Sequence, residues 1–256
     1  MDMYVGIDVA FAKNKYLPVV CSRMERGVLK PLPLREWRSS RPPKGKGNVK
    51  IVEGLDLPEF AEDAREYLKK LEDVFEGKIR RIAIDAPKQA RPDDCARRAC
   101  EFALDNHGIS CITTPSLSQF DEIRTKARDF LTNGGKEPHL PHANQLWMLA
   151  GFELFKKLSE QWDCIEVYPH AIAVALKASE THKSNTEGLS NQLLAVSSHT
   201  GWPTSDNPIK ELKQIAFGSA HDKLDAYLSS WVASLDDDHL KAIGCPPDDV
   251  IWVPSI

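Results

Sequence analysis

Residues 4–10, YVGIDVA, and residues 79–87, IRRIAIDAP, decide the fold of this chain. Each stretch has the length of a strand and contains a short apolar run, and each carries one aspartate directly after that run, Asp8 and Asp85. Pro87 forces the chain out of the sheet directly after Asp85, because proline cannot donate a ladder hydrogen bond. A lone ionised carboxylate among buried neighbours is costly to desolvate, so both aspartates need a compensating partner.

Strand and helix patterns alternate around these two stretches. Residues 16–21 and 28–34 suit strands that follow the first one through short connections, which favours an antiparallel meander. Helical spacing covers residues 57–75, and residues 164–168 suit a later strand. We expect an α/β fold with a central mixed sheet, in which three antiparallel N-terminal strands precede parallel strands, flanked by helices.

The rest of the chain reads as mostly helical, within a single domain over residues 1–256. Helical patterns cover residues 94–104, 118–131, 142–162 and most of 171–237, and residues 250–253 suit a last short strand. We expect a helical insertion at about residues 114–162.

Charge is balanced over the chain but concentrated in one segment. With 33 basic and 37 acidic residues the formal charge is −4, which argues against a protein that coats nucleic acid over its whole surface. Residues 35–50, REWRSSRPPKGKGNVK, hold six basic residues against one acidic, with two prolines and two glycines. This composition predicts a mobile basic loop, which either binds phosphates through Arg38, Arg41, Lys44 and Lys46 or is simply solvated.

The sequence gives no sign of a membrane segment or a leader peptide. No stretch approaches 18 consecutive apolar residues, and the first residues form a strand pattern where a signal peptide would have a basic and then an apolar region. We therefore expect a cytoplasmic protein that makes no membrane contact.

A late helix offers two more carboxylates. Asp222 and Asp225 are three residues apart and so share one helical face. Oxygen ligands from two strands and one helix suit Mg²⁺ or Mn²⁺, and two such ions about 3.5–4 Å apart could activate water against a phosphodiester. We expect Asp8, Asp85, Asp222 and Asp225 to converge on a metal site.

Each candidate ligand also has a simpler interpretation. Asp222 could cap its helix, with Asp225 helping the helix dipole. Asp85 could be an ordinary turn residue before proline, and Asp8 could accept backbone hydrogen bonds. Glu166 could pair with a lysine or an arginine as readily as with a metal.

Four stretches carry a resemblance to a known family: GIDVAF, IDAPKQARPDDCARR, IEVYPHA and HDKLDAYLSSWVA. In this order they resemble the uncharacterised group described as predicted ribonuclease-H-like nucleases, distantly related to Holliday-junction resolvases. The resemblance implies a ribonuclease-H-like fold, with Asp8, Asp85, Asp222 and Asp225 as metal ligands and Glu166 as a further catalytic acid.

The resemblance also suggests residues that contact the substrate. Arg91, Asp94 and Arg97 match an Arg-x-x-Asp-x-x-Arg run, and AFAKNKY replaces the usual glycine-rich turn after the first aspartate. His170 stands where an acidic residue often follows the proline, so these departures concern the substrate more than the fold. The substrate-binding residues expected here are Arg91, Arg97, Lys13, Arg41, Lys44 and Lys46.

Three functions remain open on the sequence. The leading hypothesis is a nuclease that uses Mg²⁺ or Mn²⁺ to hydrolyse nucleic acid by a two-metal mechanism. A second is a nucleotide-binding phosphotransfer protein of the actin and sugar-kinase type, although the chain has one core and no glycine-rich phosphate loop. A third is a non-catalytic module that binds nucleic acid or protein, and a homodimer is compatible with all three.

Overall fold

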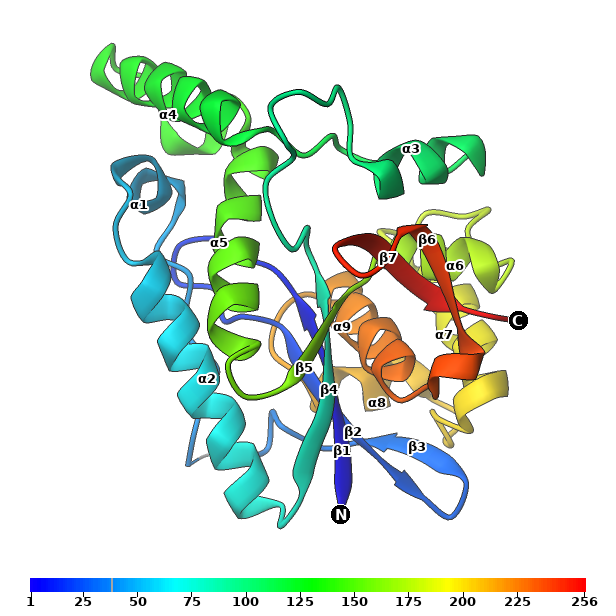
Figure 1. Cartoon of the computed structure of the whole chain (residues 1–256). Helices are drawn as coiled ribbons and strands as arrows, with labels where there is room; N and C mark the ends of the chain where they lie inside the picture. The colour runs from blue at the N-terminus through cyan, green and yellow to red at the C-terminus, as the bar shows by residue number, and fades with distance from the viewer. Residues whose placement is uncertain (38) are drawn as a thin grey trace.

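The computed structural model describes residues 1–37 and 39–256, and its centre is a five-stranded mixed sheet (Figure 1). Strands β1 (Asp2–Asp8), β2 (Val19–Glu25) and β3 (Val28–Pro31) form an antiparallel meander. Strands β4 (Lys78–Asp85) and β5 (Asp163–Glu166) continue the sheet in parallel on the other side of β1, giving the order β3-β2-β1-β4-β5. The predicted mixed sheet is therefore confirmed.

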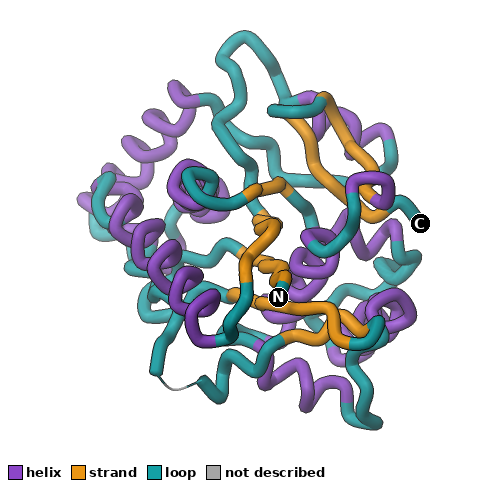
Figure 2. Tube along the Cα trace, turned by 60° about the horizontal axis from the view of Figure 1, so that its bottom comes forward, coloured by secondary structure: helices purple, strands orange, loops and turns teal. Residues whose placement is uncertain are grey.

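Helices cover both faces of this sheet (Figure 2). Helices α2 (Leu57–Val74) and α5 (Ala143–Leu158) pack on one face, where they share a core with the β1 side chains of Met3, Val5 and Ile7. Helix α9 (Ala220–Ala233) crosses the other face against β1, β2 and β4. The helices that surround α9 are α6 (Pro169–Ala175), α7 (Thr186–Thr200) and α8 (Pro208–Ile215).

Helix α9 comes unusually close to β1 at Gly6. A Cβ atom on residue 6 would lie 1.9 Å from the carbonyl oxygen of Ala226 and 2.3 Å from the backbone nitrogen of Ser230. The Ser230 hydroxyl donates to the carbonyl of Tyr4 at 3.0 Å and shares a 2.8 Å hydrogen bond with the Ser22 hydroxyl. The missing side chain at residue 6 therefore sets how near α9 lies to the sheet.

A second, two-stranded sheet closes the C-terminal part. Strands β6 (Leu240–Cys245) and β7 (Asp249–Pro254) pair in antiparallel, so the strand expected at residues 250–253 is confirmed. Strand β6 escaped prediction because its sequence, LKAIGC, is short and has small residues at two of its six positions.

Helix α3 (Ala99–Asn106) begins five residues later than the 94–104 pattern predicted. Its first N–H groups, those of Ala99 and Cys100, are accepted by the Asp249 carboxylate at 2.6 and 3.3 Å. Helix N-termini need such acceptors, and a carboxylate there also favours the helix dipole. The start of α3 is thus fixed by a residue of β7, which local sequence does not reveal.

Two other predicted boundaries differ from the structure. The strand expected at 16–21 begins at Val19, because Pro18 has no N–H and its carbonyl accepts the Asp8 N–H at 3.2 Å instead. The insertion expected at 114–162 contains α4 (Leu117–Thr132), and it also contains α5, which belongs to the layer that covers the sheet. Among the helices described here, none is long and apolar enough to cross a membrane.

We predict that Gly6→Ala destabilises the protein by about 3 kcal/mol or more, because the added methyl group meets backbone atoms of α9 that cannot move aside. Urea unfolding measures the loss. Gly27→Ala is the matched control: nothing lies within 4 Å of that Cβ position, so only its φ of 82° costs about 1–2 kcal/mol. A Gly6→Ala loss no larger than the control's would contradict this account of α9 packing.

Candidate metal centre

Three aspartates meet where β1 and β4 end. Asp8 and Asp85 are the last residues of these parallel neighbours and are paired in the sheet register. Asp225 reaches them from α9, and one carboxylate oxygen from each residue lies within 4.8 Å of the other two. The predicted convergence of two strands and one late helix is therefore found for three of the four aspartates.

The three carboxylates disfavour one another's ionised forms. Burial, followed by the nearby Asp225, Asp85 and Asp222, raises the pKa of Asp8 well above its ordinary value. Burial and Asp225 raise the pKa of Asp85 to about 8. The pKa of Asp225 is raised mainly by burial, against the opposing effect of Lys183. Without a cation, Asp85 therefore holds its proton at neutral pH, and the ionised forms of Asp8 and Asp225 are disfavoured.

One oxygen of this cluster has no partner. Asp225 is only 5% exposed, and its Oδ1 makes no hydrogen bond to any described residue. Leaving a buried carboxylate oxygen unpaired costs free energy, and a bound cation would remove that cost. Three carboxylates also form the oxygen-rich donor set that Mg²⁺ and Mn²⁺ prefer, so Asp8, Asp85 and Asp225 fit a divalent ion.

Lys183 is the one positively charged side chain seen to contact the cluster, within the described residues, and the sequence did not point to it. Its ammonium group donates to Oδ2 of Asp225. Burial lowers the pKa of Lys183, but Asp225, Asp85 and Asp8 outweigh that effect, so its pKa lies above the ordinary value. Lys183 stands in a polar connection between α6 and α7, where a lysine gives no local sign of function.

Asp222 lies outside the three-carboxylate cluster. Its Oδ2 accepts the Ser219 N–H at 2.7 Å, and the Ser219 hydroxyl accepts the Asp222 N–H, which completes a capping box at the start of α9. Oδ1 lies 3.0 Å from Nε2 of His221. Asp222 therefore caps its helix and is not one of the three oxygen donors that meet. It lines the same hollow as Asp8 and Asp225 and its charge acts on Asp8, so its share in the metal site stays a prediction.

Glu166 pairs with an arginine rather than joining the aspartates. Both of its oxygens accept hydrogen bonds from Arg98, at 2.8 and 2.7 Å, and Oε2 also accepts the Lys88 N–H at 2.8 Å. Arg98 and Glu166 are 3% and 5% exposed, so this is a buried, fully bonded ion pair. The sequence left open whether Glu166 pairs with a basic side chain or with a metal, and the structure shows the ion pair with Arg98.

Arg91 and Arg97 hold the loop around α3 and α4. Arg91 is buried and donates to the Thr114 carbonyl at 3.2 Å and to Oε1 of Gln119 at 2.5 Å. Arg97 donates to the Asp105 carboxylate and lies 3.4 Å from Sγ of Cys111. Both arginines therefore make internal contacts, and their contact with a substrate stays a prediction.

The predicted basic loop is anchored at several points. Lys44 lies over the Tyr16 ring at 4.7 Å, and Arg41 lies over the Phe217 ring at 4.8 Å. Lys46 pairs with Glu59 at 2.5 Å, whereas Lys13 is exposed. Backbone hydrogen bonds also join residues 43–47 to residues 11–17. Arg38 lies outside the described residues.

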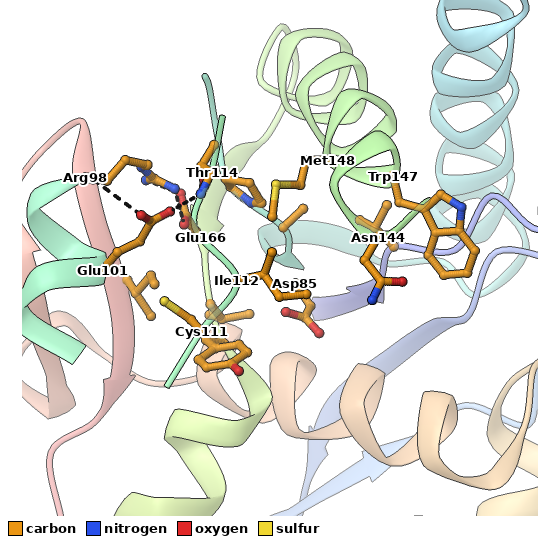
Figure 3. A pocket seen from close by; sticks show the side chains of 16 residues that line it. Asp85, Arg98, Glu101, Cys111, Ile112, Thr114, Asn144, Trp147, Met148 and Glu166 are labelled. Atoms are coloured by element: carbon orange, nitrogen blue, oxygen red, sulfur yellow. Dashed lines mark hydrogen bonds and ion pairs between the residues drawn. The ribbon is translucent and has the colours of Figure 1, made fainter. Parts of the chain in front are cut away.

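Three hollows border the cluster. A mostly apolar cavity of about 220 Å³ has Asp85 between two groups of side chains, with Arg98 and Glu166 on one side and Asn144 and Trp147 on the other (Figure 3). A second hollow is lined by Asp85 and Lys183, and a third by Asp8, Asp225, Lys15 and Tyr16. The carboxylates are thus reached from more than one side.

A family model described as "Protein of unknown function (DUF429)" matches residues 44–249 of this sequence. The chain belongs to this family. The matched DUF429 residues include Asp85, Lys183 and Asp225, whereas Asp8 precedes them. The comparisons with curated proteins and with solved structures gave no match.

We predict that Asp85→Asn stabilises the metal-free protein at pH 8. The folded pKa of Asp85 is about 8 against an ordinary 3.8, so the folded state binds one more proton than the unfolded state between these values. Stability therefore falls as pH rises from 4 to 8, and the amide removes that loss, a gain on the order of 2 kcal/mol. Urea unfolding in EDTA at pH 8 and pH 5 measures it.

The expected advantage of Asp85→Asn shrinks at pH 5, where the parent carboxyl is protonated in the folded state. An exposed aspartate changed in the same way, Asp238→Asn, serves as the control and should stay within about 0.5 kcal/mol of the parent at both pH values. If the parent protein is as stable as Asp85→Asn at pH 8, ionising Asp85 costs no folding free energy, and the raised pKa of Asp85 is contradicted.

Proposed function

We propose that this DUF429 protein is a ribonuclease-H-like nuclease that hydrolyses phosphodiester bonds of a nucleic acid with Mg²⁺ or Mn²⁺. The observation that carries the proposal is the meeting of Asp8, Asp85 and Asp225 within 4.8 Å. Two of these carboxylates come from the ends of neighbouring parallel strands and the third from a helix packed on the same sheet. Burying three carboxylates together lowers the stability of the fold. This cost is typical of a functional site, where stability is given up for activity.

The arrangement of the sheet supports the same assignment. The sequence motifs that resemble ribonuclease-H-like nucleases lie at the end of β1, the end of β4, the end of β5 and in α9. Three antiparallel strands followed by two parallel ones agree with the fold that this resemblance implied. The fold class alone would not assign an activity, so the proposal depends on the carboxylates.

Basic and aromatic side chains beside Asp8 favour a polyanionic substrate. Lys15 and Tyr16 line the same hollow as Asp8 and Asp225. Tyr16 packs against Phe217 with ring centroids 4.7 Å apart, and Lys44 and Arg41 lie over these two rings. Positive charges next to an acidic centre would hold the phosphates of a strand, and the two rings hold Lys44 and Arg41 in place.

The position of each acidic side chain sets its role in the proposed reaction. Asp8, Asp85 and Asp225 hold the ion, which when bound supplies a Lewis acid for the phosphate and lowers the pKa of a bound water. Arg98 and Glu166 act at a distance, because their buried pair keeps the end of β5 and the start of α3 together. A non-catalytic binding module would use the same hollows beside the aspartates. It would differ from a nuclease by binding the ion and nucleic acid without cleaving the strand.

We expect cleavage of single-stranded, hybrid or branched nucleic acid in Mn²⁺ or Mg²⁺, none in EDTA, and a loss of at least about 100-fold in Asp8→Asn, since even outer-shell changes at metal sites cost about 10–100-fold. Gel assays on labelled substrates of each kind measure the rate. Asp238→Asn should cleave like the parent. Equal rates for Asp8→Asn and the parent would refute the proposal.

A further inference from the structure

The number of cations in the cluster can be argued from its oxygens. Two ions about 3.5–4 Å apart, as in two-metal sites, need carboxylate oxygens that serve both. Asp225 is the most buried of the three aspartates, and its Oδ2 already accepts the Lys183 ammonium. Of the two Asp225 oxygens only Oδ1 is then left without a partner, so while Lys183 is in place this carboxylate offers one oxygen to a cation and cannot give one oxygen to each of two ions.

Neither of the neighbouring carboxylates, Glu166 and Asp222, is free to supply oxygens for a second ion. Glu166 has both oxygens on Arg98, and Asp222 accepts the Ser219 N–H while it lies next to His221. In the ionised cluster the three negative charges of Asp8, Asp85 and Asp225 are neutralised by one ammonium and one divalent ion together. A second divalent ion would bring the net charge of the cluster to about +2 with Lys183 in place, against about +1 without it, so the lysine disfavours the second ion.

The position of Lys183 is built into the connection that carries it. Asn185 caps α7 by accepting the Gly188 N–H at 2.7 Å, and its own N–H donates to the His182 carbonyl at 3.2 Å. A Cβ atom on Gly188 would lie 2.3 Å from the His182 carbonyl oxygen and 2.5 Å from that of Thr181. The backbone just before Lys183 therefore packs directly on the first turn of α7, which directs the lysine toward Asp225.

We infer that the acidic centre takes one divalent cation and that Lys183 supplies the second positive charge, which a second metal ion would otherwise provide. The inference rests on the proposed metal site. It narrows the two-metal mechanism expected from the sequence to one ion and one ammonium. Lys183 also lines the hollow beside Asp85, so in this arrangement it faces the place where a substrate phosphate would lie.

The test counts bound ions and requires no cleavage. Mn²⁺ is titrated by calorimetry, with electron paramagnetic resonance of free Mn²⁺ as the second measurement, into the full chain and into Lys183→Met. Methionine is unbranched and one atom shorter than lysine, and it removes the charge. Lys177→Met, in the same connection but exposed, is the matched control. Lys183→Gln serves as a second uncharged variant, and circular dichroism verifies that each variant is folded.

We expect one Mn²⁺ per chain for the parent and for Lys177→Met, and two per chain for Lys183→Met, because Oδ2 of Asp225 becomes free for a second ion. Two ions on the parent would overturn the inference and leave the nuclease proposal standing. One ion on both the parent and Lys183→Met would also overturn it. No ion on the parent would remove the metal site itself, and the proposed function with it.

Discussion

Helix α9 can lie against strand β1 only because residue 6 carries no side chain. The Cβ position of Gly6 falls within 1.9 Å of the Ala226 carbonyl oxygen, one residue beyond Asp225. The same contact that packs the helix on the sheet therefore brings the Asp225 carboxylate to the end of β1. Since β1 and β4 are in parallel register, Asp8 and Asp85 are already side by side at that end, and the helix adds the third oxygen donor.

Bringing these carboxylates together lowers the stability of the folded state through charge repulsion. Other groups in the structure reduce this repulsion. Lys183 offsets part of the negative charge, and protonation of Asp85, whose pKa is raised to about 8 by burial and Asp225, offsets a further part at neutral pH. The Arg98–Glu166 pair nearby is fully hydrogen-bonded and requires nothing further. The unpaired oxygen of Asp225 is what distinguishes the cluster from an ordinary buried ion pair.

The sequence predicts those features that depend on neighbouring residues. Asp8 and Asp85 were identified because each interrupts a buried apolar run, and parallel strands carry their ends to one edge of a sheet. The partners of Asp222 and Glu166 could not be assigned, because a helix cap and an ion pair are equally compatible with an acidic residue in a motif. Lys183, the Asp249 cap of α3 and strand β6 were missed, since each depends on contacts between segments far apart in the chain.

Diffraction from a crystal soaked in Mn²⁺, recorded where manganese scatters anomalously, tests most directly whether the three aspartates form a metal centre. We predict one anomalous peak within bonding distance of Asp8, Asp85 and Asp225, with the Lys183 ammonium still on Asp225. A fully soaked crystal with no peak among these carboxylates, or with the three side chains turned toward separate regions of solvent, would contradict the account.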